Sequence, residues 1–504
     1  MKEWMSTGAS RAWLGVAVAG LLVVALVFAL TLLPRLGAGQ RVIDAAEPAF
    51  TDARVEGTRA GVLTISQYVD VVDPLLTRRG GAAADVAQFV GYLQRSLGLS
   101  ADQVRKILRR EAPHTEALMR ALPLAGVAAE IPRLTTYLAT IMGMPEEELA
   151  AILESDFPGT SQSLTALSNT ADAWYDVPGI DGLTRLSQGK PVRTVPGLRK
   201  YLRDDLVPLT VDHKDGFQSL AGSGGIGYIP FMLLAIGAGL LALGLWQARR
   251  AADGLTGMLS WGVVCATGVL LTLVVVAGQY FPRLGGAQAM IVALEPAFSE
   301  ERVGGLATGA EAIRDAIAFG TPIMTPAGGA AREAPRLYRL VAQRTGRRTD
   351  DVRRALRRRA PRTAALLSAI PLTQVGTEIP RLLAYLQKPL RMSRAEVVAA
   401  LRKRTPRLTR ALLTTPDVAR AWNALPDTAR MTRFDGVTPV RTMPELDGYL
   451  REDLIPVFVE ASADFETFAG GRPPVDTLAP VLLVTGLFLM FYGAMMMQLG
   501  VRRL

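Results

Sequence analysis

The sequence predicts an all-α polytopic membrane protein, with four transmembrane helices and two homologous, mainly helical extracytoplasmic domains. Two observations support this fold class. Four apolar stretches of about 20 residues or more carry no charged residue, and a helix of that length can cross a hydrocarbon core of about 30 Å. The second half of the chain also repeats the first at a constant offset of 248 positions, which indicates a tandem duplication.

The four apolar stretches are predicted to be permanent transmembrane helices. Tryptophan and tyrosine residues stand at several of their ends, where amphipathic rings prefer the headgroup region. The first stretch resembles a signal peptide, but its apolar core is longer than the roughly 7–15 residues typical of one, and its equivalent in the repeat lies inside the chain. The predicted spans cover residues 13–33, 226–246, 258–280 and 477–498.

The repeat predicts where the large domains lie. The motif EIPRL occurs at Glu130–Leu134 and again at Glu378–Leu382, and 21 of the 35 positions of Val104–Leu138 are identical in the second copy. Because each copy contains two spans, both copies must cross the membrane in the same orientation. The large domains, residues 34–225 and 281–476, are therefore predicted to lie on the same side.

The short segments on the other side predict the orientation. Residues 1–12, 247–257 and 499–504 hold six basic and two acidic residues, and short loops rich in Lys and Arg stay cytoplasmic. Both termini are therefore predicted to be cytoplasmic and both large domains extracytoplasmic. The preference for Arg over Lys and the abundance of Ala suggest a bacterial chain in the plasma membrane.

A shorter period of 45 residues is nested within each domain. The spacing of Val104, Leu108 and Pro113 recurs 45 residues later and again in the second copy. Each unit is predicted to be a short helix, stopped by a proline that cannot continue it, followed by a second helix. Ser393 and Glu396 are spaced as a capping box at one of these helix starts. Outside the helices, only the motif PVRT in each copy suggests an extended or turn element.

The EIPRL motif is predicted to mark a helix start. Pro132 and Pro380 suit the first turn of a helix, and Glu130 and Glu378 would lie near the positive end of its dipole. The alternative is a ligand site that contains Glu130 and Arg133. The structural interpretation is preferred, because helix-start chemistry alone explains these residue types.

Residues that could carry catalysis or hold a cofactor are scarce. The chain has one Cys and two His, and it contains no phosphate-binding loop, nucleophile elbow or dinucleotide fingerprint. The glycine-rich stretch 222–227 is interpreted as a hinge before a span. The acidic pairs Asp204-Asp205 and Glu452-Asp453 could be general acids or cation ligands. They are interpreted as a solvated helix face, since neighbouring residues on a helix diverge. No enzyme activity, cofactor or metal is predicted.

The two domains differ in charge. Residues 34–225 carry a net charge of −3 and residues 281–476 one of +9, and Arg344–Arg362 alone contains nine arginines. Such a cluster could bind an anionic lipid or an envelope polymer. The alternative is a solvated helix face balanced by acidic patches of the neighbouring domain. The candidate residues are Arg344, Arg347, Arg348, Arg353, Arg354, Arg357, Arg358, Arg359 and Arg362.

Together these features predict a non-enzymatic integral membrane protein of the bacterial cell envelope. Its paired domains would bind a partner, which could be lipid, envelope polymer or another membrane protein, but not nucleic acid outside the cell. Its oligomeric state is left open. One alternative is a component of a transport or channel complex, although the spans lack the ionisable groups that ion-coupled transport normally requires. A membrane-bound enzyme is the third hypothesis.

Overall fold

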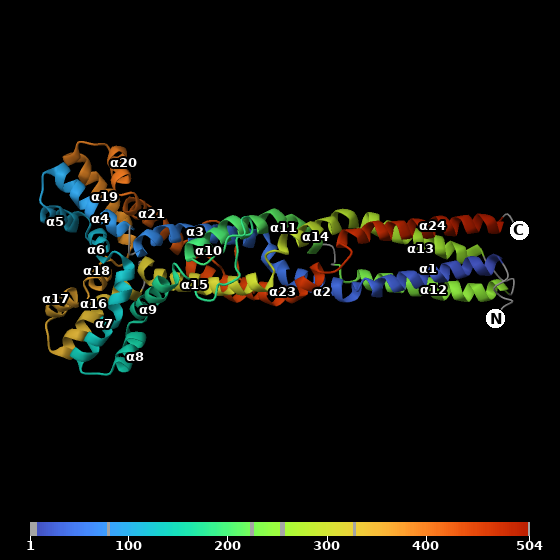
Figure 1. The fold of residues 1–504 in the computed structure, drawn as a ribbon, viewed down its shortest axis with the longest axis horizontal. Coiled ribbons are helices and arrows are strands. Elements are labelled where there is room, and N and C mark those ends of the chain that lie inside the picture. The colour runs from blue at the N-terminus through green and yellow to red at the C-terminus, as the bar shows by residue number, and fades with distance from the viewer. Residues whose placement is uncertain (1–7, 78–80, 222–225, 253–257, 326–328, 502–504) are drawn as a thin grey trace. The chain divides into compact units, whose positions relative to one another are not determined.

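The computed structural model describes residues 8–77, 81–221, 226–252, 258–325 and 329–501. Within these ranges the regular structure is helical (Figure 1), apart from two single antiparallel β-bridges, Thr184–Pro191 and Thr432–Pro439. These bridges confirm the extended element predicted at PVRT. The glycine-rich stretch 222–225 lies outside the described residues, and so do several charges used to predict the orientation: Lys2, Glu3, Asp253, Arg502 and Arg503.

The chain forms two compact units, and each unit draws segments from both the first and the second half of the chain. The predicted domains, residues 34–225 and 281–476, are therefore not two separate compact bodies. The first unit consists of Met1–Thr51, Leu209–Val303 and Pro456–Leu504, and the second of Asp52–Pro208 and Gly304–Ile455.

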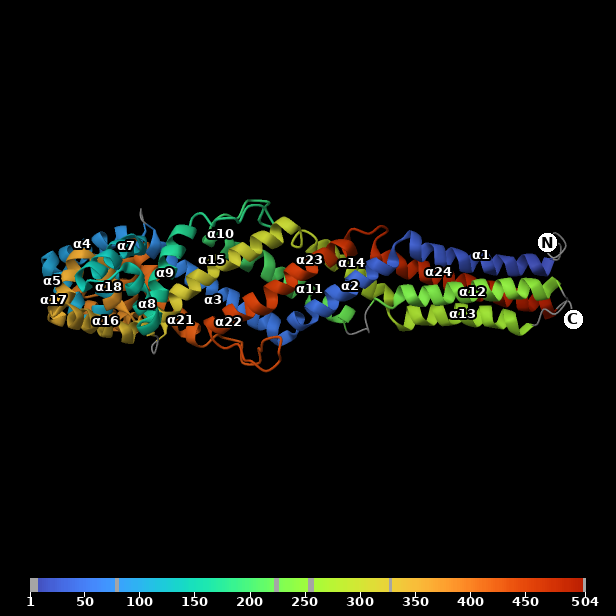
Figure 2. The same ribbon diagram turned by 90° about the horizontal axis from the view of Figure 1, so that it is seen from below.

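Among its described residues, the first unit contains four helices that are long and apolar enough to cross a membrane, as predicted. Among them α1 packs against α12, and α13 packs against α24 (Figures 1 and 2). Trp13 and Trp261, which are equivalent in the repeat, stack with ring centroids 3.6 Å apart. The helices are α1 (Gly8–Ala29), α12 (Ile229–Ala252), α13 (Met258–Ala277) and α24 (Leu478–Val501).

Two of these helices end before the predicted spans do. Thr31 and Gln279 adopt left-handed backbone conformations, with φ of 47° and 52°, and such residues interrupt an α-helix. The last residues of the predicted spans 13–33 and 258–280 therefore belong to the following helices. The remaining elements of this unit are α2 (Leu32–Ala46), η1 (Glu47–Phe50), α11 (Val207–Ala221), α14 (Tyr280–Leu294), α23 (Ile455–Ala469) and η4 (Val475–Thr477).

The second unit is built largely from a three-helix group that occurs twice in each half. The middle helix of every group has 11 residues, and a proline begins every third helix. This confirms the predicted 45-residue unit of short helix, proline and second helix. The groups are α4 (Ala82–Leu97), α5 (Ala101–Glu111) and α6 (Pro113–Ala121); α7 (Leu124–Met142), α8 (Glu146–Asp156) and α9 (Pro158–Ala173); α16 (Gly329–Thr345), α17 (Thr349–Arg359) and α18 (Pro361–Ala369); and α19 (Thr373–Leu390), α20 (Arg394–Arg404) and α21 (Pro406–Asn423).

The groups of the two halves are interlaced. Helices α4–α6 pack with α19–α21, and α7–α9 pack with α16–α18 (Figure 1); we call these the first lobe and the second lobe. Helix α6 packs against α18 and so connects the lobes. One continuous apolar cluster contains residues of both halves, including the buried Trp174 and Trp422. Each lobe therefore needs one group from each half.

The long helices α3 (Asp52–Leu76) and α15 (Glu300–Met324) also contact the opposite half of the chain. On each of them two glycines lie so close to side chains of the other half that an added Cβ would stand less than 3 Å away. The pairs obey the repeat offset: Gly57 with Met431, Gly61 with Leu446, Gly305 with Leu183 and Gly309 with Leu198. The contacted residues belong to or precede α10 (Val195–Tyr201) and α22 (Met443–Tyr449), which continue into short π-helical segments, η2 (Leu202–Leu206) and η3 (Leu450–Leu454).

Candidate functional site

The glutamates of the EIPRL motif bind helix N-termini of the opposite half. Glu378 accepts hydrogen bonds from the backbone N–H groups of His114 (3.1 Å) and Thr115 (2.8 Å) at the start of α6. Glu130 accepts the equivalent bonds from Arg362 and Thr363, both at 3.0 Å, at the start of α18. The two contacts are related by the repeat offset and therefore link the halves reciprocally.

The prediction that the EIPRL motif marks a helix start was wrong. Pro132 and Pro380 lie inside α7 and α19, not in a first turn. The carboxylates do meet the positive end of a helix dipole, but the helix belongs to the other half. The interpretation as a ligand site gains no support, because Glu130 is engaged in this contact and Arg133 is exposed.

Two further carboxylates make the same contact and were missed from the sequence. Asp85 accepts from the N–H groups of Arg407 (2.8 Å) and Leu408 (2.9 Å) at the start of α21. Glu333 accepts from Gly159 (3.1 Å) and Thr160 (2.7 Å) at the start of α9. The 45-residue period contained the signal, because an acidic residue occurs 45 positions before each EIPRL glutamate.

The unpaired backbone N–H groups at the start of each contacted helix explain why a carboxylate binds there. Proline at the first position has no N–H, so the next two N–H groups need an acceptor, and no side chain of the N-cap residue supplies one. A carboxylate satisfies both groups and interacts favourably with the dipole. Burial alone would raise the pKa of Glu378, but hydrogen bonds from His114 and Thr115 outweigh it and hold the pKa below its ordinary value.

The acidic pairs were expected on a solvated helix face, and this was wrong for one member of each. The Asp205 carboxylate is buried and pairs with Arg185 through two hydrogen bonds. Asp453 pairs with Arg433 in the same way, with both N–O distances 2.9 Å. These carboxylates lie on the π-helical segments and bind the arginine beside each β-bridge, so their role is structural.

The arginine cluster lies on the second lobe, from the end of α16 through α17 to the start of α18. All nine of its arginines are exposed. Two of them pair with acids of their own helix: Arg353 with Asp350 at 3.6 Å and Arg354 with Asp351 at 2.5 Å. The hydrogen bond from Arg354 lowers the pKa of Asp351.

Two other arginines of the cluster have contacts that recur elsewhere in the fold. Arg359 lies over the Tyr137 ring, 5.7 Å from its centroid. Arg404 lies over the Tyr92 ring and Arg110 over the Tyr385 ring in the same manner. The three tyrosines lie on the first helix of their groups, α7, α4 and α19. Arg362 lies 3.8 Å from the carboxylate of Glu130. The structure therefore explains Arg359 and Arg362 by packing between helix groups.

Five arginines remain, and we call them the free arginines. Among the residues that the structure describes, none of the five forms an ion pair with a carboxylate, including the three glutamates at the start of α8. No ion pair therefore supports the alternative of a face balanced by neighbouring acids at these positions, although Asp351 interacts electrostatically with Arg348 without forming an ion pair. The free arginines are Arg344, Arg347, Arg348, Arg357 and Arg358.

Neither a protein-family model, nor a curated protein, nor a solved structure matches this chain. Within the described ranges, no group of three or more His, Cys, Asp or Glu side chains could hold a metal ion.

Proposed function

We propose that this protein is a non-enzymatic integral membrane protein of the bacterial cell envelope, and that its second unit binds an anionic partner. The observation that carries the proposal is the set of five free arginines, which are exposed on the second lobe and form no ion pair among the described residues. Exposed guanidinium groups without internal partners attract lipid headgroups and phosphate-bearing polymers. Transport is not proposed, because the spans pack around buried Trp13 and Trp261, and residues 13–33, 226–246, 258–280 and 477–498 contain no Asp, Glu, Lys, Arg or His.

The orientation belongs to the same proposal. The excess of Lys and Arg in the short segments between and beyond the spans supports cytoplasmic termini and an extracytoplasmic location of the second unit. A reporter fused after Leu504 should then be active in the cytoplasm, and a tag inserted at the exposed Gly189 should be accessible from outside. A tag at Gly189 that is protected in intact cells would contradict this orientation.

Flotation with vesicles tests the partner. The full-length protein, reconstituted in neutral phosphatidylcholine nanodiscs, should bind vesicles that contain phosphatidylglycerol, and binding should weaken as salt rises because exposed charges are screened over about 8 Å at physiological ionic strength. Each Arg near an anionic surface contributes about 1 kcal/mol. Replacing Arg347, Arg348, Arg357 and Arg358 by Gln should therefore abolish most of the binding.

A matched variant controls for overall charge. Arg105, Lys106, Arg394 and Lys403 are exposed on the first lobe, and replacing them by Gln removes the same charge. This control should retain binding to phosphatidylglycerol vesicles. Equal losses in the two variants would contradict a specific role of the free arginines. A parallel experiment with soluble polyphosphate distinguishes a polymer from a lipid surface.

A further inference from the structure

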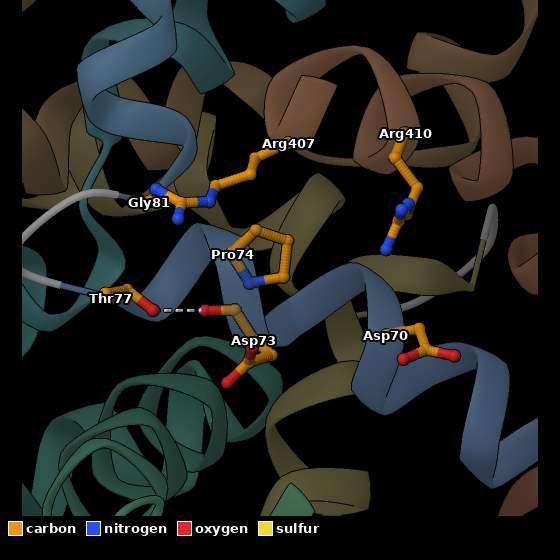
Figure 3. A pocket seen from close by; sticks show the side chains of 7 residues that line it. All are labelled: Asp70, Asp73, Pro74, Thr77, Gly81, Arg407 and Arg410. Atoms are coloured by element: carbon orange, nitrogen blue, oxygen red, sulfur yellow. Dashed lines mark hydrogen bonds between the residues drawn. The ribbon is translucent and has the colours of Figure 1, made fainter. Parts of the chain in front are cut away.

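A pocket between α3 and α21 brings together side chains of opposite charge (Figure 3). Its volume is about 260 Å³. The helix α3 comes from the first half of the chain and α21 from the second, and both belong to the second unit. The lining residues are Asp70, Asp73, Pro74, Thr77, Gly81, Arg407 and Arg410.

The acidic side of the pocket is held in place by hydrogen bonds. One carboxylate oxygen of Asp73 accepts from the indole N–H of Trp174 (2.8 Å) and from the hydroxyl of Tyr175 (3.3 Å). The hydroxyl of Thr77 donates to the Asp73 carbonyl at 2.7 Å. Asp70 is paired with Arg199 through one of its oxygens. Both carboxylates are thus positioned, and each has a second oxygen for another donor.

The basic side is less engaged. Arg407 and Arg410 project from α21, and Arg410 points toward the part of α3 that carries Asp70 (Figure 3). Within the described part of the chain no ion pair is formed by either guanidinium, so none joins them to Asp70 or Asp73 across the pocket. The helix start itself is already occupied, because the N–H groups of Arg407 and Leu408 bind Asp85.

The other half of the repeat provides an internal comparison. The positions equivalent to the four charged residues are Ala318, Thr321, Gly159 and Gln162. The same helices form there, and α9 starts at a proline and binds Glu333 just as α21 binds Asp85. The fold therefore forms without these four charges. Asp70 and Asp73 have protein partners in Arg199, Trp174 and Tyr175, whereas among the described residues neither the Arg407 nor the Arg410 guanidinium group forms an ion pair with an acidic partner.

We propose that this pocket binds a small zwitterion of the phosphoethanolamine class, with its ammonium group at Asp70 and Asp73 and its phosphate at Arg407 and Arg410. Guanidinium groups offer several donors to one phosphate, and the carboxylates balance an ammonium charge. The pocket, about 260 Å³ in volume, has room for a molecule of this size. This proposal does not depend on the free arginines.

Calorimetric titration of the full-length protein in neutral detergent tests the site. Phosphoethanolamine should bind at least about tenfold more tightly than ethanolamine or inorganic phosphate alone. Asp70→Ala and Arg410→Gln install the residues of the other half at exposed positions, so the fold should be retained; this is checked by thermal unfolding. Each change should weaken phosphoethanolamine binding at least about tenfold, whereas Gln162→Ala in the uncharged counterpart should leave it unchanged.

Several results would overturn the proposal: no binding of phosphoethanolamine at millimolar concentration, equal binding of inorganic phosphate, or unchanged binding in both pocket variants. A second probe identifies the source of the ligand. Tighter binding of glycerophosphoethanolamine, a diester, would support the site and indicate a lipid headgroup. Tighter binding of phosphoethanolamine, a monoester, would support it and indicate a free metabolite.

Discussion

Four acidic residues, Asp85, Glu130, Glu333 and Glu378, bind the N-termini of helices in the opposite half of the chain. Hydrogen bonds to charged groups contribute about 1.5–3 kcal/mol each. Removing the charge also leaves the dipole of a buried helix start without its counter-charge. These residues are therefore expected to determine how firmly the two halves hold together.

Glu378→Gln should destabilise the second unit by about 1–3 kcal/mol, because a neutral amide accepts these bonds more weakly and its NH2 group faces two donors. Thermal unfolding of the full-length protein in detergent measures the change. The pKa of Glu378 is lowered on folding, so its carboxylate stabilises the fold above the ordinary pKa of Glu, about 4.3, and that stabilisation is lost as pH falls through the folded value.

The difference between wild type and Glu378→Gln should accordingly be largest near neutral pH and shrink below about pH 4. Glu147→Gln, on an exposed position of α8, is the matched control and should stay close to wild type. A Glu378→Gln protein as stable as wild type at pH 7 would show that the capping contact does not contribute to stability.

At the level of elements, glycines set how closely α15 approaches its neighbours. A Cβ on Gly320 would lie 2.7 Å from the Trp422 ring and 2.9 Å from the Tyr68 hydroxyl, whereas nothing lies within 4 Å of a Cβ on Gly304 in the same helix. Both rings are buried and in contact with each other. They therefore have little room to move.

Gly320→Ala should destabilise the protein by about 1–3 kcal/mol, as overpacking of a core does. Gly304→Ala should be neutral or stabilising by up to about 1 kcal/mol, because Ala is the better helix former and the site is open. Thermal unfolding of the two variants compares the same substitution in one helix. If both variants are equally stable, the close contact of Gly320 with Trp422 is wrong.

The helices themselves could be predicted from the sequence, whereas their partners could not. The capping box at Ser393 and Glu396 is present, and the 45-residue period located the short helices, because capping and proline effects act within a few residues. A contact between Glu378 and Thr115 uses the same residue types as one between Glu378 and Thr363 would. A repeated sequence therefore cannot distinguish contacts within a copy from contacts between copies.

The candidate sites, too, could be predicted from the sequence only in part. Nine clustered arginines were visible in the sequence, but the contacts of Arg359 with Tyr137 and of Arg362 with Glu130 depend on helix groups from the other half. The charged pocket was not predicted, because Asp70 and Arg410 are 340 positions apart and become neighbours only when α3 packs against α21. Only long-range packing could reveal it.

At the level of the whole molecule, the interlacing of the two halves is the central claim. Both compact units draw on both halves, and each lobe of the second unit pairs one helix group with a group from the opposite copy. Such reciprocal contacts resemble the isologous interface of a two-fold dimer joined into one chain. An isolated half would expose the apolar cluster that the two halves now share.

Dividing the chain within residues 253–257 tests this claim most directly. The two half-chains, produced together in the same membrane, should co-purify as a one-to-one complex that unfolds in a single thermal transition near that of the intact protein. Each half-chain produced alone should not be a folded monomer. Two half-chains that fold separately, remain monomeric and do not associate would contradict the interlaced structure.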